Sequence, residues 1–173
     1  MYSESATAPA TPFLRVPAPL RPALERRGFT QLTGVQEAVL AADDGVRDLQ
    51  IQSQTGSGKT VALGFVLASR LLADAGRNEP GPTTLIITPT RELAMQVCDE
   101  LAWLFADVRG ITFDCVTGGT NVDRERLRLR RRPTVLVGTP GRLLDHLTAG
   151  ALECSDVAQL VLDEADQMLD MGF

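Results

Sequence analysis

One glycine-rich segment of the sequence has the residue types and the spacing that hold a nucleotide phosphate. It runs from Ser53 to Thr60 and reads Ser-Gln-Thr-Gly-Ser-Gly-Lys-Thr, between an apolar stretch at 48–53 that we interpret as a strand and a helical pattern. Glycines let backbone N–H groups close around a phosphate, and the N-terminus of the following helix adds partial positive charge. Lys59 can then reach the β and γ phosphates, and Thr60 can hold Mg²⁺.

A glycine- and serine-rich turn between a strand and a helix is the structural alternative for this segment. The general phosphate-loop pattern opens with glycine, and this chain has Ser53 there. The Lys-Thr pair at the required offset nevertheless favours the phosphate loop. The candidate nucleotide-binding residues of the loop are Thr55, Gly56, Ser57, Gly58, Lys59 and Thr60.

A second group of chemically useful residues is a set of three carboxylates, Asp163, Glu164 and Asp166, which follow the apolar segment 160–162. Ligands of open parallel sheets bind at the carboxyl ends of the strands. Asp163 is placed to hold Mg²⁺ opposite Thr60, and Glu164 to polarise the water that attacks the γ phosphate. An acidic helix start is the alternative, since carboxylates also stabilise helix N-termini. The phosphate loop upstream favours the catalytic interpretation.

The segments that must position these groups alternate between strand and helix patterns. Two helical patterns come first, from Phe13 to Gly28 and from Val35 to Ala42. Strand patterns then lie at 48–53, 83–88, 111–117, 134–138 and 158–162, and helical patterns at 58–73, 91–106, 120–131, 140–148 and 164–170. This alternation predicts an α/β domain with a parallel sheet and helices on both faces. Residues 1–12 are expected to form a disordered tail.

Composition restricts the class of protein further. The 17 basic and 22 acidic residues give a net charge of −5, so a bound polyanion must be held by placed groups rather than by a general basic field. No stretch approaches the roughly 18 apolar residues of a membrane helix, and the N-terminus lacks a signal peptide, so we expect a cytoplasmic protein without a membrane partner. Cys98, Cys115 and Cys154 lack the spacing of metal or redox sites and are interpreted as small buried apolar residues.

Together these motifs resemble those of the DEAD-box family of ATP-dependent RNA helicases. Residues 163–166 spell the Asp-Glu-Ala-Asp motif that names the family, and 53–60 resembles its phosphate loop, in which a small residue routinely replaces the first glycine. Three further matches follow expected strands in the family's order: 89–94, Gly118-Gly119, and 139–142.

The resemblance covers about residues 13–173 and implies an N-terminal RecA-like ATP-binding domain that is incomplete at its C-terminus. The segment 28–36 resembles the family's adenine-recognition segment, in which the Gln36 amide offers a donor and an acceptor to the base. ATP with Mg²⁺ is therefore the implied cofactor. Phe13 is the candidate to stack on the base. Leu32 and Gly34 depart from the prolines usual in the family.

The resemblance also implies a surface for single-stranded or duplex RNA, held by sugar and phosphate contacts without sequence information. Its implied members are Thr90, Arg91, Gly119, Thr139 and Arg142. For the two arginines a surface salt bridge is the alternative.

Two further features receive no such role from the sequence. The arginine-rich run from Arg124 to Arg132 is interpreted as a solvated helix end, which suits the helix dipole better than it suits an RNA groove. His146 lies on a predicted helix away from the motifs, and we expect no catalytic role for it.

The implied function is the coupling of ATP hydrolysis to local RNA unwinding in a full-length protein. The family continues with a Ser-Ala-Thr motif, which partners Asp166 in coupling, and with a second RecA-like domain that supplies arginine fingers. Without these, the chain alone is expected to bind nucleotide and to be nearly inactive. The strand leading to Ser-Ala-Thr would lie between 48–53 and 158–162, so a chain ending at Phe173 is expected to be marginally stable. A non-catalytic ATP-binding regulatory module and a DNA-directed motor of the wider superfamily remain alternatives.

Overall fold

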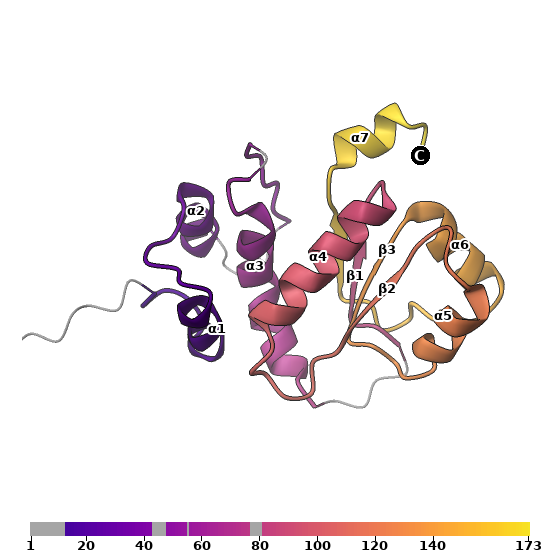
Figure 1. Cartoon of the computed structure of the whole chain (residues 1–173), viewed down its shortest axis with the longest axis horizontal. Coiled ribbons are helices and arrows are strands. Elements are labelled where there is room, and N and C mark those ends of the chain that lie inside the picture. The colour runs from indigo at the N-terminus through magenta and orange to yellow at the C-terminus, as the bar shows by residue number, and fades with distance from the viewer. Residues whose placement is uncertain (1–12, 43–47, 55, 77–80) are drawn as a thin grey trace, which may run out of the picture.

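The computed structural model describes residues 13–42, 48–54, 56–76 and 81–173 (Figure 1). The expected tail at 1–12 and Thr55 lie outside the described residues. In chain order the elements are the 3-10 helix η1 (Ala18–Leu20), α1 (Arg21–Arg26), α2 (Gly34–Ala42), α3 (Lys59–Asp74), β1 (Thr84–Ile87), α4 (Arg91–Leu104), β2 (Phe113–Val116), α5 (Val122–Leu129), β3 (Val135–Gly138), α6 (Pro140–Thr148), β4 (Gln159–Leu162) and α7 (Ala165–Asp170).

The four strands form one parallel sheet in the order β2-β3-β1-β4. β1 is central, with Ile87 paired to Gly138 of β3 on one side and to Leu162 of β4 on the other. Because the pairing is parallel and in register, the loops that follow the strands leave the sheet at one edge. The sheet therefore gathers the sequence motifs at a single end of the domain.

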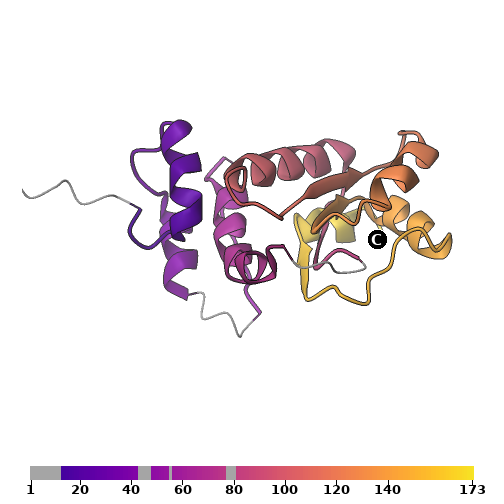
Figure 2. The ribbon, with the colours of Figure 1, turned by 90° about the horizontal axis from the view of Figure 1, so that it is seen from below.

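Helices cover both faces of the sheet, which confirms the predicted α/β architecture (Figure 2). Alternate strand residues enter different cores: Ile86 belongs to the larger core with α3 and α4, whereas its neighbour Leu85 belongs to a smaller core with Leu129 of α5 and Leu143 of α6. This separation follows from the two-residue period of side chains along a strand.

The segment 48–53 is not a strand, contrary to the sequence prediction; the structure assigns no strand within residues 48–54. A strand exists only where its backbone is paired, and a cavity of about 530 Å³ lies between Leu49 and Ile51 on one side and β4 on the other. β4 is consequently an edge strand, and Leu160 and Leu162 are 61% and 55% exposed. Apolar, β-favouring residues at 48–53 thus lack the partner that would make them a strand.

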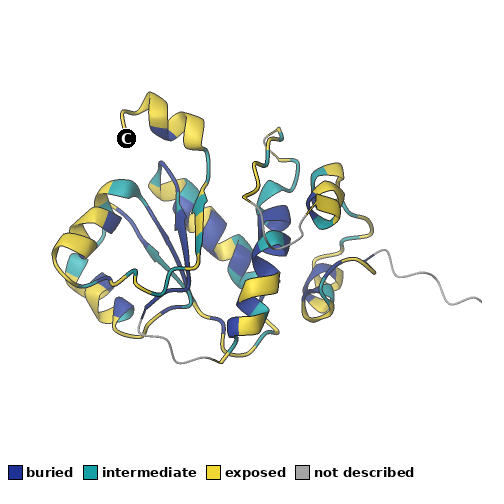
Figure 3. Ribbon diagram, turned by 180° about the vertical axis from the view of Figure 1, so that it is seen from behind, coloured by how far each residue is buried: buried dark blue, intermediate teal, exposed yellow. Residues whose placement is uncertain are grey.

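The two N-terminal helices lie on the far side of α3 from the sheet (Figures 1 and 2). Leu20 and Leu24 are fully buried in the larger core, and α2 packs against α3. The Arg27 guanidinium lies 4.7 Å from the ring centre of Trp103 in α4, a cation–π contact that ties this layer to α4. Exposed residues, drawn in yellow in Figure 3, make up most of α7 and lie on one side of α1 and of α2.

Candidate functional site

The phosphate-loop segment turns tightly onto the N-terminus of α3. Gly56 and Gly58 have φ of +78° and +86°, a backbone conformation that favours glycine, and Gly58 is the N-cap of α3. The Ser57 hydroxyl donates to Ser53 Oγ at 2.8 Å. Ser53, the one departure from the general pattern, therefore closes the loop with a hydrogen bond that glycine could not make.

Lys59 and Glu164, which are 105 residues apart in sequence, form an ion pair at the end of the sheet, with Nζ 2.5 Å from Oε1. The hydrogen bond to Glu164 raises the pKa of Lys59 above its ordinary value, against the opposing effect of partial burial. Glu164 has φ of +53°, an uncommon conformation for a residue other than glycine. This backbone turn lies between the end of β4 and the start of α7.

Lys59, Thr60 and Asp163 line the same cavity of about 530 Å³. Burial raises the pKa of the Asp163 carboxyl, although the nearby Lys59 charge lowers it. A cation would stabilise this poorly solvated carboxylate. Mg²⁺ prefers oxygen ligands and keeps several waters, so one carboxylate and one hydroxyl on a shared cavity fit it.

Gln36 is fully buried beside the phosphate loop. Its Oε1 accepts a hydrogen bond from the Thr33 N–H at 3.0 Å, and its Nε2 donates to the Gly58 carbonyl at 3.3 Å. A Cβ on Gly58 would lie only 2.4 Å from Gln36 Nε2, so this close approach requires glycine. The amide retains one further donor and acceptor position.

Phe13 lies in the larger core of the domain. Its side chain is 1% exposed and packs with Val16 and Leu20. This burial gives the ring a packing role, and its stacking on a nucleobase stays a prediction.

A second cavity, of about 390 Å³, brings together residues from three of the sequence motifs. It is lined by Pro89, Arg91, Gly118, Thr139, Gly141, Arg142, Asp145 and Phe173. Gly119 lies beside it, because a Cβ there would be 3.3 Å from Arg91 Nη1. Thr90 is the N-cap of α4, and its hydroxyl accepts from the Leu93 N–H at 3.3 Å. The five residues expected to contact RNA thus follow β1, β2 and β3 at one edge of the sheet.

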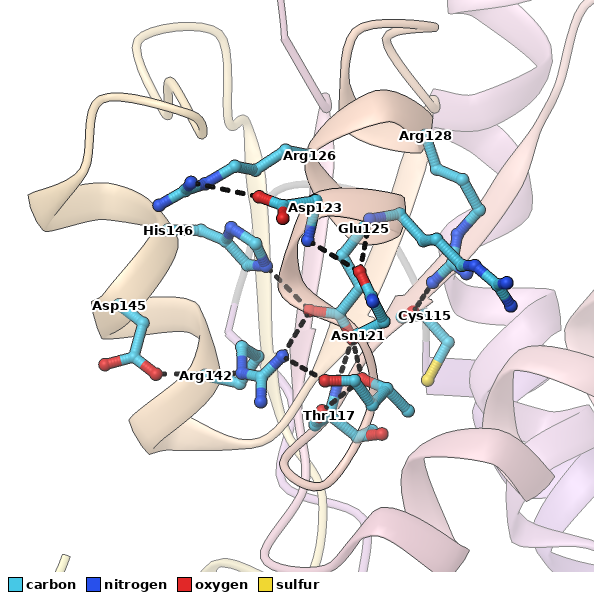
Figure 4. Close-up of polar contacts among 12 residues, drawn as sticks. Cys115, Thr117, Asn121, Asp123, Glu125, Arg126, Arg128, Arg142, Asp145 and His146 are labelled. Carbon is cyan, nitrogen blue, oxygen red and sulfur yellow. Dashed lines mark hydrogen bonds and ion pairs between the residues drawn. The ribbon is translucent and has the colours of Figure 1, made fainter.

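The Arg142 side chain is only 9% exposed, because it pairs with Glu125, a residue that the sequence analysis gave no role (Figure 4). Glu125 is 1% exposed, and its Oε2 accepts from Arg142 Nη1 at 2.7 Å and lies 2.8 Å from His146 Nε2. Its Oε1 accepts from the Thr117 N–H at 3.1 Å and lies close to the Thr120 hydroxyl. Burial opposes the charge, yet these hydrogen bonds hold the pKa of the Glu125 carboxyl below its ordinary value.

His146 is therefore linked through Glu125 to the motif residue Arg142, and its expected lack of a catalytic role stays a prediction. Helical periodicity contained a signal for both missed residues: Glu125 stands four residues before the buried Leu129, and His146 three residues after the buried Leu143. Each consequently shares the buried face of its helix. Arg130, Arg131 and Arg132 lie exposed at the end of α5, whereas Arg128 pairs with Asp114 at 2.9 Å.

Asp166 and the three cysteines lie outside the contacts described above. Asp166 is exposed in the first turn of α7. The three cysteines are free thiols, and burial raises the pKa of Cys98 to about 12 and that of Cys115 to about 11, so both stay protonated at neutral pH. Among the described residues no helix is long and apolar enough to cross a membrane.

Comparison with known proteins gives consistent relatives. A family model described as DEAD/DEAH box helicase matches residues 33–173. The chain is 42% identical over 151 residues to the ATP-dependent RNA helicase DbpA of Bacillus subtilis, covering 87% of the chain and 30% of that protein. It is 39% identical over 160 residues to the ATP-dependent RNA helicase DeaD of Escherichia coli, covering 92% of the chain and 25% of that protein.

A solved structure from the same family also matches the chain. The crystal structure of a DEAD box protein from the hyperthermophile Methanococcus jannaschii matches with a TM-score of 0.78 and 33% identity, over 92% of this chain and 42% of that one. The chain thus spans less than a third of the length of the two helicases named above.

Proposed function

Because the chain belongs to the DEAD/DEAH box helicase family, we propose that it is the ATP-binding, N-terminal RecA-like part of an enzyme that couples ATP hydrolysis to local RNA unwinding. The observation that carries the proposal is the meeting of Lys59 with Glu164 beside the cavity that Thr60 and Asp163 line. Phosphoryl transfer needs a cation that binds the phosphates, oxygen ligands that hold Mg²⁺, and a group that orients the attacking water. Here these would be one lysine, one hydroxyl with one carboxylate, and a second carboxylate.

In the proposed reaction, Lys59 leaves Glu164 and binds the β and γ phosphates, while the backbone N–H groups of the phosphate loop surround them. Glu164, released from Lys59, accepts a hydrogen bond from the attacking water and orients it toward the γ phosphorus. Thr60 and Asp163 would hold Mg²⁺, which would neutralise the phosphate charge. The buried Gln36 amide gives the preference for adenine through its remaining donor and acceptor.

RNA is proposed to bind along the cavity next to Arg91, Gly119, Thr139 and Arg142, with Thr90 at the start of α4. Charged and backbone donors of this kind bind the sugar-phosphate chain without reading the bases. A second RecA-like domain of the same full-length protein would complete both sites, and Asp166 would take part in coupling between them. The proposed location is the cytoplasm.

The experiment compares the isolated chain with a protein in which it is joined to a second RecA-like domain. The joined protein should hydrolyse ATP faster when single-stranded RNA is added, whereas the isolated chain should show neither RNA-stimulated turnover nor strand separation in a gel assay. An arginine finger is worth about a thousandfold or more in phosphoryl transfer, which is why the isolated chain should be nearly inactive. Unwinding by the purified chain would refute this part of the proposal.

Two alternatives are tested by the same protein. Stimulation by single-stranded DNA rather than RNA would indicate a DNA-directed motor. Nucleotide binding with no hydrolysis by the joined protein would indicate a regulatory module. The presence of both Lys59 and Glu164 favours the hydrolytic function over that module.

A further inference from the structure

Glu125 is the one carboxylate among the described residues that is at most 1% exposed, and it contacts Arg142 as well as the two residues that flank Gly118-Gly119. Oε1 contacts the loop after β2 through the Thr117 N–H and the Thr120 hydroxyl. Oε2 contacts α6 through Arg142 and His146. One buried carboxylate therefore joins the loop that holds Gly118-Gly119 to the helix that carries Arg142 (Figure 4).

These contacts also restrict Arg142 itself. Its Nη1 donates to Glu125 and lies 3.4 Å from the Thr120 carbonyl oxygen, and its Nε lies 3.6 Å from the exposed Asp145 carboxylate. Arg142 nevertheless lines the 390 Å³ cavity. A guanidinium held at two nitrogens has a fixed direction, and fixed donors lose less entropy when they bind a phosphate.

We propose that Glu125 is a positioning residue for RNA binding, which fixes the loop 117–120 against Arg142 so that both contact the same strand. This inference rests on the proposed RNA surface. His146 is the second anchor of the carboxylate, since its Nε2 occupies the remaining side of Oε2 and is itself 1% exposed. Neither residue needs to touch RNA.

Glu125 could either position Arg142 or sequester it, and the direction of the change in RNA affinity when Glu125 is removed distinguishes the two roles. If Glu125 merely sequesters Arg142, its removal frees a cation and RNA binding becomes stronger. If Glu125 positions Arg142, its removal weakens RNA binding even though the protein loses a negative charge. With a net charge of −5, loss of one carboxylate should by itself favour a polyanion.

The test uses Glu125→Gln in the full chain and the binding of a fluorescein-labelled single-stranded oligouridylate, followed by anisotropy at several salt concentrations. The Gln amide can still accept from Thr117 but turns a donor toward Arg142. We expect the Kd for RNA to rise about tenfold, the loss of roughly one charge-assisted contact. The dependence of log affinity on log salt should become shallower by about 0.7, the value for one phosphate of a single strand.

Three controls make the result specific. Glu153→Gln, an exposed carboxylate on the loop after α6, matches the change in charge and should leave RNA affinity unchanged or slightly higher. Binding of a fluorescent adenosine diphosphate with Mg²⁺ should be unchanged in Glu125→Gln, which a general loss of structure would not allow. Thr120→Val, which removes one contact to Oε1 and keeps the shape, should raise the Kd about threefold and serves if Glu125→Gln does not melt cooperatively.

Failure of this inference differs from failure of the proposed function. If the unmutated chain binds RNA and Arg91→Ala weakens that binding, whereas Glu125→Gln and Thr120→Val leave it unchanged or stronger, the positioning role is overturned and the RNA surface stands. If neither the unmutated chain nor the protein in which it is joined to a second RecA-like domain binds RNA at low salt, both are overturned.

Discussion

The Lys59 ammonium lies 2.5 Å from the Glu164 carboxylate. The cation expected to bind phosphate and the carboxylate expected to orient water are therefore paired with each other. Both side chains are partly exposed, at 25% and 33%, so the pair is screened and a nucleotide can displace it. In the proposed site, the γ phosphate would therefore compete with Glu164 for Lys59. Binding would break this contact and release the carboxylate for catalysis in a single exchange.

Lys59→Ala should remove binding of ATP with Mg²⁺, because it deletes the contact to the β and γ phosphates. Isothermal calorimetry measures this against the unmutated chain, for which we expect binding in the micromolar to millimolar range. Arg109→Ala, an exposed cation after α4, is the matched control and should bind as the unmutated chain does. If the calorimetric binding curve of Lys59→Ala matches that of the unmutated chain, the phosphate-loop assignment is wrong.

Glu164→Gln should strengthen nucleotide binding by about three- to tenfold, since it ends the competition for Lys59 while keeping a neutral hydrogen bond. In a two-domain protein the same change should abolish hydrolysis. Lys59 is the only lysine of the chain, so an amine-reactive reagent and peptide mapping report on it directly. Glu164 raises the pKa of Lys59, so acylation at a fixed pH should be faster in the variant. Slower acylation would contradict the ion pair.

Gln36→Ala should narrow the preference for ATP over GTP without changing the dependence of binding on the phosphates. Competition of each nucleotide against a fluorescent adenosine diphosphate measures the preference. The change also removes the hydrogen bond to Gly58, so a modest loss of affinity for both nucleotides is expected. Should GTP compete as well as ATP with the unmutated chain, adenine recognition by Gln36 is wrong.

Glu125→Ala should lower the free energy of unfolding at pH 7 by about 3–5 kcal/mol, because Arg142 and His146 lose their buried partner. The pKa of Glu125 is lowered in the folded protein, so its contribution is present above its ordinary value of 4.5 and is lost as the pH falls through the folded value. The unmutated chain should accordingly lose more stability than the variant when the pH falls below about 4.5. Thermal melts of both proteins across acidic pH measure the difference, and parallel curves would count against it.

Completing the sheet should stabilise the domain sharply. β4 exposes an unpaired edge beside the cavity at 48–51, and backbone groups left unpaired there favour self-association. Adding about 35 residues of a native continuation, enough for one helix and one strand, should raise the Tm and reduce light scattering. A cooperative, monomeric melt that the extension leaves unchanged would falsify the strand position assumed between 48–53 and 158–162.

Local sequence patterns predicted helices such as α3 and α6 closely. The hydrogen bonds of a helix form within the helix itself, and the residues at its ends mark where it starts and stops. The helix after the phosphate loop was expected at 58–73 and lies at Lys59–Asp74, and the helix at 140–148 was predicted to the residue. Thr139-Pro140 explains the latter, since proline is well suited to the first helical position. The strands are shorter than expected, because only paired backbone is counted as strand.

Three features were harder to place from the sequence, because a local pattern does not show which residues it will pair with or pack against. The stretch 48–53 has the composition of a strand and lacks a neighbour to pair with. Phe13 was interpreted by its ring chemistry, whereas its 1% exposure reflects packing against residues of other elements. The role of Glu125 was missed because it lies among exposed arginines, although its spacing of four residues from Leu129 indicated that both lie on the buried face of the helix.

The open edge of β4 lies beside the proposed nucleotide site. The cavity that separates 48–51 from β4 is also lined by Lys59, Thr60 and Asp163, so we expect a strand that pairs with β4 to lie next to that site. Binding of such a strand and binding of nucleotide are coupled when one changes the affinity of the other, and the coupling is then reciprocal. A strand that raises the affinity for nucleotide by some factor must itself be held more tightly by the same factor once nucleotide is bound.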